Sequence, residues 1–178
     1  MKTQARTITT ATAIGGIALL LAGAACELAG ARVNTSKSIP VGLYWTTGAP
    51  MDKGAYVLLC PPQAEAFSEA RDRGYLGAGF CPGGYGYLMK RVAATENDTV
   101  TITGEGVRVN GKLLPLSAPR QADRAGRPLP RYQANEYVLG SDEVLLMSDR
   151  SATSFDGRYF RPVNRSQLKA TITPIITW

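Results

Sequence analysis

Histidine is absent from this chain of 178 residues. Without histidine, neither a Ser-His-Asp nor a Cys-His catalytic site can form, and most metal sites lose their commonest ligand. Acid–base chemistry would therefore have to use Lys, Asp, Glu, Tyr or Cys side chains, and we expect neither a metal ion nor another cofactor.

Runs of basic residues are also absent, although the formal net charge is +6 at pH 7. Lysines and arginines are scattered, and no nucleic-acid-binding motif accompanies them. We therefore expect no nucleic-acid partner and favour contact with anionic lipid headgroups. The length suits one domain together with a targeting segment, and there are no internal repeats.

The N-terminal segment carries no charge between Thr7 and Cys26, directly after the basic residues Lys2 and Arg6. About 20 apolar residues can span a bilayer as a helix. The basic flank predicts that the N-terminus stays inside while the rest of the chain is exported.

The fate of this segment is open from the sequence. A cleaved secretory signal competes with a permanent anchor, because Ala-Gly-Ala at residues 22–24 and again at 29–31 resembles a cleavage site. Lipidation of Cys26 is a weaker alternative, since the residue three positions before it is glycine, where a lipoprotein signal usually has leucine. Each alternative assigns residues 1-31 to a signal or membrane anchor and residues 32-178 to the exported domain.

Most of the exported part alternates short β-favouring runs with turn residues, which predicts a mainly β domain with a single core. Strands are expected within residues 42–45, 55–60, 85–92, 99–116, 143–149 and 169–178. Asn110-Gly111 predicts a type I′ hairpin turn, and Pro174 is expected to interrupt the last strand. One helix is predicted in this part, over Glu65 to Arg73. Residues 117–136 are rich in Pro and Arg, which predicts a long solvated loop.

Cys60 and Cys81 are each followed by proline and flank the predicted helix. In an oxidising compartment a structural disulfide is the default for such a pair. A redox-active pair is the alternative, although it would more often form a tight Cys-x-x-Cys motif.

Three polar segments draw attention to possible chemistry. The first, "NTSKSIP", places the hydroxyls of Thr35, Ser36 and Ser38 just before a rigid Ile-Pro step, at the point where the chain would leave the membrane. Taken alone, such a Ser/Thr-rich stretch is more typical of a linker.

The second segment, "GGYGYLMKRVAA", contains a lysine among apolar residues. In a strand, Lys90 shares one face with Leu88 and Val92, while Arg91 points to the other face. Burial lowers the pKa of a lysine, and a neutral lysine can act as a general base. A lysine that snorkels from a strand edge is the alternative.

The third segment, "MSDRSATSFDGRYF", concentrates hydroxyl and charged groups after a buried strand, which suits either a functional loop or a polar capping loop. If it is extended, Ser154, Asp156 and Arg158 share one face. Together the three segments fit one chemistry, because a serine nucleophile without histidine needs a neutral lysine as its base and a further hydroxyl to orient that lysine.

These segments resemble a known family. "SKSIP", "YLMKRV" and "SDRSATSFDGR" are similar, in the same order, to the serine, lysine and Ser-x-Asp-x-Arg boxes of the type I signal peptidases. Those enzymes are membrane-anchored Ser–Lys proteases with a β-rich exported domain. Within that superfamily, "NTSKSIPVGLYW", "FCPGGYGYLMKRV" and "SFDGRYF" resemble the TraF-type conjugative-transfer peptidases of plasmids.

The resemblance implies roles for particular residues. Ser38 corresponds to the nucleophile and Lys90 to the general base, while the Ser36 hydroxyl and the Ser38 N–H correspond to the oxyanion hole. Ser154 corresponds to the hydroxyl that orients the lysine. One departure is the proline directly after Ser-Ile, which puts the substrate rules of ordinary signal peptidases in doubt.

Asp156 and Arg158 correspond to a charged pair that braces the site, and in TraF-type enzymes this aspartate is itself functionally important, so we place Asp156 with the catalytic residues. A carboxylate beside the lysine would raise its pKa, so we expect Asp156 to pair mainly with Arg158.

The implied function is that of a membrane-associated serine endopeptidase or transpeptidase, located in the periplasm and attached to or facing the outer surface of the cytoplasmic (inner) membrane. The implied partner is a conjugative pilin precursor, which is cleaved and can be cyclised, as pilus assembly and plasmid transfer require. Two alternatives remain: a non-enzymatic periplasmic pilus-assembly protein, and a thiol oxidoreductase that uses Cys60 and Cys81.

Overall fold

Successive side chains of β5 (Leu88–Ala94) point to opposite faces of the sheet, and their burial follows this alternation rather than their polarity. Lys90, Val92 and Ala94 are buried, whereas Arg91 between them is exposed. The predicted alternation is therefore confirmed. The strand begins at Leu88 rather than at Tyr85, because Tyr85, which follows the short 3-10 helix η1 (Pro82–Gly84), forms isolated bridges with Ala78 and Cys81 instead.

The computed structural model describes residues 2–178, and the side chains of residues 13–178. Its seven-stranded antiparallel sheet has the order β1-β2-β12-β3-β5-β10-β11. Besides β5, these strands are β1 (Ala31–Asn34), β2 (Gly42–Thr47), β12 (Leu168–Thr177), β3 (Tyr56–Leu59), β10 (Glu143–Met147) and β11 (Val163–Asn164). The predicted mainly β class is confirmed.

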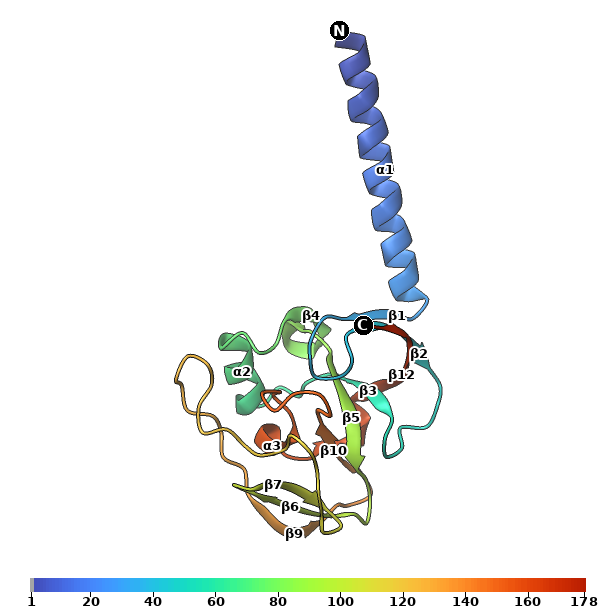
Figure 1. Cartoon of the computed structure of the whole chain (residues 1–178). Helices are drawn as coiled ribbons and strands as arrows, with labels where there is room; N and C mark the ends of the chain where they lie inside the picture. Colours follow the sequence, from blue (N-terminus) through green and yellow to red (C-terminus); the bar gives the residue numbers. More distant parts are fainter. Residues whose placement is uncertain (1) are drawn as a thin grey trace.

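A second, four-stranded antiparallel sheet has the order β8-β7-β6-β9. Its strands are β8 (Lys112–Leu113), β7 (Gly106–Val109), β6 (Thr99–Thr103) and β9 (Ala134–Val138). Asn110 and Gly111 join β7 to β8 with φ angles of 50° and 78°, as the predicted type I′ turn requires. In Figure 1 this sheet lies at the end of the body farthest from the N-terminal helix.

The remaining elements are short. They are α2 (Glu65–Asp72), which confirms the predicted helix, β4 (Ala78–Cys81), α3 (Gly157–Phe160) and the 3-10 helix η2 (Arg165–Gln167). Helix α3 was not expected, because a single turn is too short to show a helical period. The long loop expected over residues 117–136 is confirmed up to Gln133, where β9 follows.

Helix α1 (Lys2–Leu28) projects away from the β-rich body (Figure 1). Its large apolar side chains from Ile14 onward are exposed. No helix is long and apolar enough to cross a membrane in the part of the chain whose side chains are described. The division at residues 31 and 32 stays a prediction, and the side chains of Lys2 and Arg6 lie outside the described ones.

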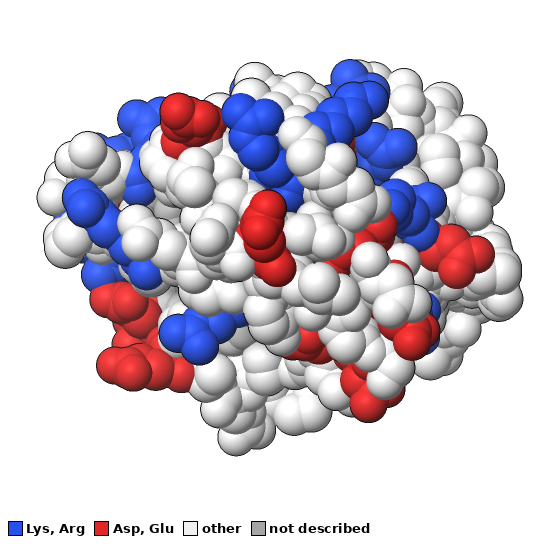
Figure 2. Space-filling view, turned by 90° about the horizontal axis from the view of Figure 1, so that it is seen from below, with Lys and Arg blue, Asp and Glu red and all other residues white. Residues whose placement is uncertain are grey.

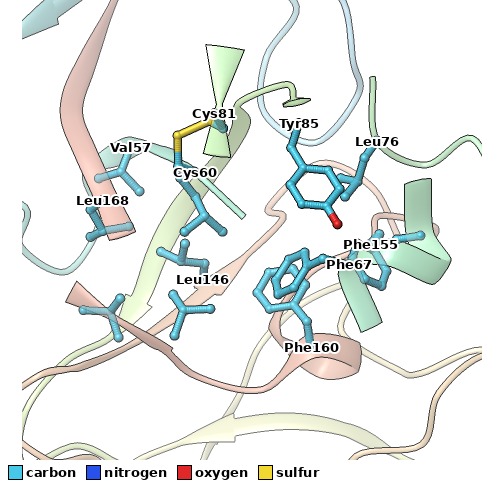
Figure 3. Packing of buried hydrophobic residues seen from close by; sticks show 14 of the residues in the cluster. Val57, Cys60, Phe67, Leu76, Cys81, Tyr85, Leu146, Phe155, Phe160 and Leu168 are labelled. Carbon is cyan, nitrogen blue, oxygen red and sulfur yellow. A yellow bond between two sulfur atoms is a disulfide. The ribbon is translucent and has the colours of Figure 1, made fainter. Parts of the chain in front are cut away.

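The two sheets share apolar contacts through β5 and β10. Leu145 and Met147 of β10 are buried against Val100 and Ile102 of the small sheet. On the other side of the large sheet, aromatic rings of α2 and α3 form a second cluster (Figure 3). This arrangement holds β5 and β10, at the centre of the molecule, between two packed layers.

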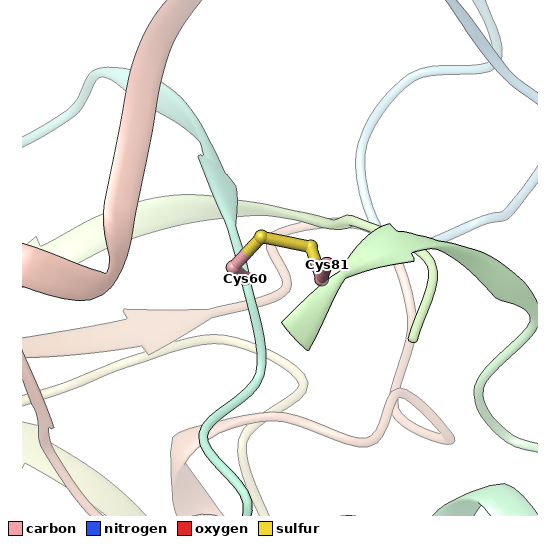
Figure 4. Close-up of a disulfide and its surroundings, with 2 residues drawn as sticks. All are labelled: Cys60 and Cys81. Carbon is pink, nitrogen blue, oxygen red and sulfur yellow. A yellow bond between two sulfur atoms is a disulfide. The ribbon is translucent and has the colours of Figure 1, made fainter. Parts of the chain in front are cut away.

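A disulfide joins Cys60 to Cys81 across 21 positions of sequence, with the two Cα atoms 5.4 Å apart. It links the chain just after β3 to β4 (Figure 4). Both cysteines are buried in the same apolar cluster as Phe67 and Tyr85. The predicted pairing is confirmed, whereas Cys26 is a free, exposed cysteine.

Replacing both Cys60 and Cys81 by Ser should lower the free energy of unfolding by about 3 kcal/mol, because the unfolded chain regains the freedom of the closed loop. The midpoint of thermal unfolding should fall by about 10 °C, and calorimetry measures it. The matched control is Cys26→Ser, which should leave the midpoint unchanged. An unchanged midpoint in the double variant would show that the bond adds nothing to stability.

Candidate active site

The loop between β1 and β2 is organised by Asn34, a buried residue at the end of β1. Its Nδ2 donates to the carbonyl oxygens of Ser36, Ile39 and Pro40 at 2.9, 3.1 and 2.9 Å, so three acceptors share two hydrogens. Its Oδ1 accepts from the Ser36 N–H and from the Ser36 hydroxyl at 3.1 and 2.9 Å. The stretch therefore has a defined shape and is no flexible linker.

Ile39 anchors this loop in the interior. Its side chain has no exposed area and packs with Tyr44, Leu58 and Ile172. The Tyr44 hydroxyl also donates to the Pro40 carbonyl at 2.6 Å. Because Ile39 packs in the core, its neighbour Ser38 lies at the surface, where it lines a cleft.

Ser38, Lys90 and Ser154 meet although they come from three separate segments. Lys90 Nζ lies 2.7 Å from Ser38 Oγ and 2.9 Å from Ser154 Oγ. The two hydroxyl oxygens lie 3.0 Å from each other. The structure thus brings together the serine, the lysine and the second hydroxyl that the three sequence segments suggested.

Lys90 is only 2% exposed, so its ammonium form would be almost without water. Burial lowers the pKa of Lys90 from 10.5 to about 8; the negative charge of Asp156 raises it and the positive charge of Arg158 lowers it further. At pH 7 a lysine with this pKa is neutral for about a tenth of the time, far more than an exposed lysine, and the neutral form can accept a proton.

Asp156 and Arg158 form a fully buried ion pair, as expected. Arg158 Nε and Nη2 donate to Asp156 Oδ1 and Oδ2 at 2.7 and 2.8 Å, which is a bidentate contact. The expectation of an extended segment is wrong, because Asp156 is the N-cap of α3 and accepts from the Arg158 N–H. A side chain at Gly157 would approach the Leu146 carbonyl oxygen to 2.8 Å, so this turn requires glycine.

Ser148 connects the ion pair to the serine loop. Its backbone N–H donates to Asp156 Oδ2 at 3.0 Å, and its hydroxyl donates to the carbonyl oxygen of Ser38 at 2.7 Å. Sequence reasoning counted Ser148 only among the hydroxyls of its segment and did not single out Asn34. Ser148 follows the buried strand β10 directly, and this position could have indicated a functional role. For Asn34 the sequence offered only the tendency of Asn to hydrogen-bond nearby backbone groups.

The two groups expected in the oxyanion hole lie next to each other. The Ser38 N–H donates to Ser36 Oγ at 3.4 Å, and the Ser36 hydroxyl donates to Asn34 Oδ1. A change of the Ser36 side-chain rotamer that moves Oγ away from both the Ser38 N–H and Asn34 Oδ1 would free both donors for an incoming oxygen. The oxyanion role therefore stays a prediction for Ser36 and Ser38.

The cleft in front of these residues has a volume of about 840 Å³ and is lined by Ser36, Ser38, Lys90 and Ser154 among others. It is large enough for several residues of a peptide. Among the described residues, no group of His, Cys, Asp or Glu side chains is arranged to hold a metal ion. Separately, the cleft holds the Ser38 hydroxyl beside the amine of Lys90, and a neutral amine can take the proton of a hydroxyl.

The chain is similar to several known proteins. A crystal structure of a signal peptidase I from Enterococcus faecalis V583 aligns with 72% of this chain and 100% of its own, at a TM-score of 0.41 and 14% identity. A plasmid transfer protein TraF from Escherichia coli is 68% identical over 165 residues, covering 93% of each protein. A conjugal transfer protein TraF from Agrobacterium tumefaciens (strain 15955) is 37% identical over 157 residues, covering 87% of each. The family model "Signal peptidase, peptidase S26" matches residues 4–178, and with the TraF relatives it shows that this chain belongs to the S26 signal peptidase family, among the conjugal transfer proteins TraF.

Proposed function

We propose that this protein is a serine endopeptidase that matures a conjugative pilin precursor by Ser–Lys acyl transfer at the periplasmic surface of the inner membrane. The observation that carries the proposal is the 2.7 Å contact between Ser38 Oγ and the Nζ of the buried Lys90. The names of the TraF relatives support the role in conjugation.

Acylation begins when neutral Lys90 Nζ accepts the proton of the Ser38 hydroxyl. The Ser38 oxygen then forms a bond to the scissile carbonyl carbon, and the developing oxyanion is held by the Ser38 N–H and the Ser36 hydroxyl. Lys90, now an ammonium, passes the proton to the leaving amine, the peptide bond breaks, and an ester to Ser38 remains. Ser154 keeps Lys90 in place throughout, through its 2.9 Å contact.

Release of the acyl group repeats these steps with a second nucleophile. Water gives hydrolysis, whereas the amine at the precursor's own N-terminus would give a cyclised pilin. Lys90 accepts the proton of the attacking water or amine. The ester bond then breaks, and Lys90 passes that proton to Ser38 Oγ.

Asp156 supports this chemistry from a distance. Its carboxylate bonds Arg158 and the Ser148 N–H, and Ser148 in turn holds the Ser38 carbonyl. Asp156 therefore acts as a positioning residue for the nucleophile, and its charge opposes the neutral form of Lys90 rather than favouring it.

Neither alternative function accounts for these contacts. A thiol oxidoreductase needs an accessible pair, whereas Cys60 and Cys81 are 7% and 4% exposed within an apolar cluster. A non-enzymatic assembly protein has no need of a buried lysine against two hydroxyls, because that burial costs stability.

Ser38→Ala and Lys90→Met should each abolish precursor processing, because one lacks the nucleophile and the other the base. Lys90→Arg should fail as well, since an arginine does not deprotonate in a protein. The measurement is mass spectrometry of membrane pilin precursors incubated with purified protein, and circular dichroism checks that each variant is folded. Full maturation by a folded Ser38→Ala protein would rule out the proposed peptidase.

The rate of acylation should rise with pH through a single apparent pKa near 8, because only neutral Lys90 accepts the Ser38 proton. Asp156→Asn should slow the reaction by disturbing Ser148 and Ser38, and should move that pKa downward by no more than about one unit. Because it leaves Arg158 unpaired, the variant must be assayed at a temperature where it is folded. Disappearance of the ionisation in Asp156→Asn would make the aspartate, and not Lys90, the base.

Lys90→Met should be more stable than the wild type at pH 7, by about 1–2 kcal/mol, because it removes a buried amine. The pKa of Lys90 is about 8 when folded and 10.5 when unfolded. Between pH 8 and pH 10.5 Lys90 holds its proton in the unfolded chain and has lost it in the folded one. The free energy of unfolding of the wild type should therefore rise with pH over this range, by about 3 kcal/mol. Urea unfolding at several pH values should show that this rise is missing in Lys90→Met and present in the exposed control Lys169→Met. Parallel curves for all three proteins would contradict a depressed pKa.

A further inference from the structure

The loop of residues 117–133, which borders the cleft, is held firmly where it begins. Buried Arg158 donates from Nη1 to the carbonyl oxygens of Leu116 and Ala118 at 2.8 and 3.2 Å. The N–H of Arg120 donates to the hydroxyl of Tyr159 in α3 at 2.9 Å. The start of the loop is therefore attached to the same ion pair that braces the reactive residues.

The middle of the loop is held as firmly by Asp123. Its carboxylate accepts from the Tyr75 hydroxyl at 2.5 Å, from Arg127 Nε at 2.7 Å, and from the N–H groups of Ala125 and Arg127 at 2.8 and 2.9 Å. The Tyr75 hydrogen bond is the main reason that the pKa of Asp123 lies well below its usual range. Arg73, at the end of α2, also donates to the Pro128 carbonyl at 2.6 Å. The solvated loop expected from the sequence is thus a structured wall of the cleft.

This wall brings positive charge to the cleft without matching negative charge. Arg120 and Arg124 line it from the loop, and Lys37 lines it from between the two serines. Among the described side chains, no carboxylate lies within ion-pair distance of these three cations. Asp123 is the one acidic residue that lines the cleft, and its oxygens are already occupied. By contrast, the face shown in Figure 2 carries side chains of both signs.

We propose that the cleft recognises a carboxylate of its peptide substrate through Arg120 and Arg124. The inference rests on the proposed peptidase function and specifies its substrate class, a peptide that carries a negative charge in the segment lying in the cleft. A guanidinium binds a carboxylate through two parallel hydrogen bonds, and a structured loop loses little entropy when it does so. Both arginine side chains are exposed, so the attraction is subject to screening by salt.

The carboxylate can come from an acidic side chain or from the C-terminus of a short leaving segment. The test distinguishes these sources with four fluorescein-labelled decapeptides of alanine and glycine. Each carries Glu or Gln at its centre and a free or amidated C-terminus. Binding is measured by fluorescence anisotropy on the full chain carrying Ser38→Ala, so that no result depends on turnover.

A peptide with the recognised carboxylate should bind about five- to tenfold more tightly than its neutral counterpart, and the advantage should shrink in about 0.5 M salt. When Arg120→Gln and Arg124→Gln are added to the Ser38→Ala chain, the acidic and the neutral peptide should bind equally tightly. The control pair Arg108→Gln and Arg131→Gln removes the same charge from residues that do not line the cleft, and should preserve it.

Equal affinity for acidic and neutral peptides, no binding of any peptide, or an advantage that survives loss of Arg120 and Arg124 would overturn the inference. None of these results bears on the peptidase, which the processing assay tests separately. Conversely, carboxylate binding by a protein that processes no precursor would support the site and contradict the proposed function.

Discussion

The buried ion pair between Asp156 and Arg158 connects most of the features around the cleft. Burying two charges costs several kcal/mol per ion unless the geometry is good and the remaining hydrogen-bonding groups are satisfied. Here both conditions hold. The carboxylate accepts from Arg158 and from the Ser148 N–H, while Arg158 Nη1 donates to the carbonyl oxygens of Leu116, Ala118 and Ala152. The pair therefore ties together the end of β10, helix α3 and the start of the 117–133 loop.

This pairing also limits the effect of Asp156 on the pKa of Lys90. A carboxylate bonded directly to the lysine would stabilise the ammonium form and raise its pKa. Because Asp156 is bound by Arg158, the two opposite charges act on Lys90 in opposite directions, and burial decides the outcome. Among the side chains that the structure describes, those that hydrogen-bond Lys90 Nζ are the hydroxyls of Ser38 and Ser154, which can accept from an ammonium or donate to an amine. The ion pair and the depressed pKa of the lysine are thus two results of one arrangement.

The apolar core fixes the reactive groups from behind. Phe155 lies between Ser154 and Asp156 in the chain, and its ring packs against Phe67 and Phe160 at centroid distances of 5.9 and 5.3 Å. The disulfide closes the same cluster on the side of β3 and β4 (Figure 3). In the same way, the buried side chain of Ile39 packs beneath the loop that carries Ser38 and fixes its position. Ser38, Ser148, Ser154 and Asp156 are therefore each next in sequence to a buried apolar side chain, so their positions are set by packing.

Much of the fold could be predicted because it follows from local chemistry. Alternation on β5 predicted which face Lys90 shares, Asn110-Gly111 predicted the hairpin, and two cysteines in a chain expected to be exported predicted the disulfide. The absence of histidine, with the three motifs, was enough to name Ser38, Lys90 and Ser154 as candidates. What the tertiary structure decided was contact between segments far apart in sequence: Ser148 on the Ser38 carbonyl, Asn34 across the serine loop, and the wall formed by residues 117–133. These contacts depend on how strands and loops pack in space, and no local period or motif carries that information. For the same reason the extended form expected around Asp156 was wrong, since one turn of helix there is favoured by its cap and by the close approach of Gly157 to β10.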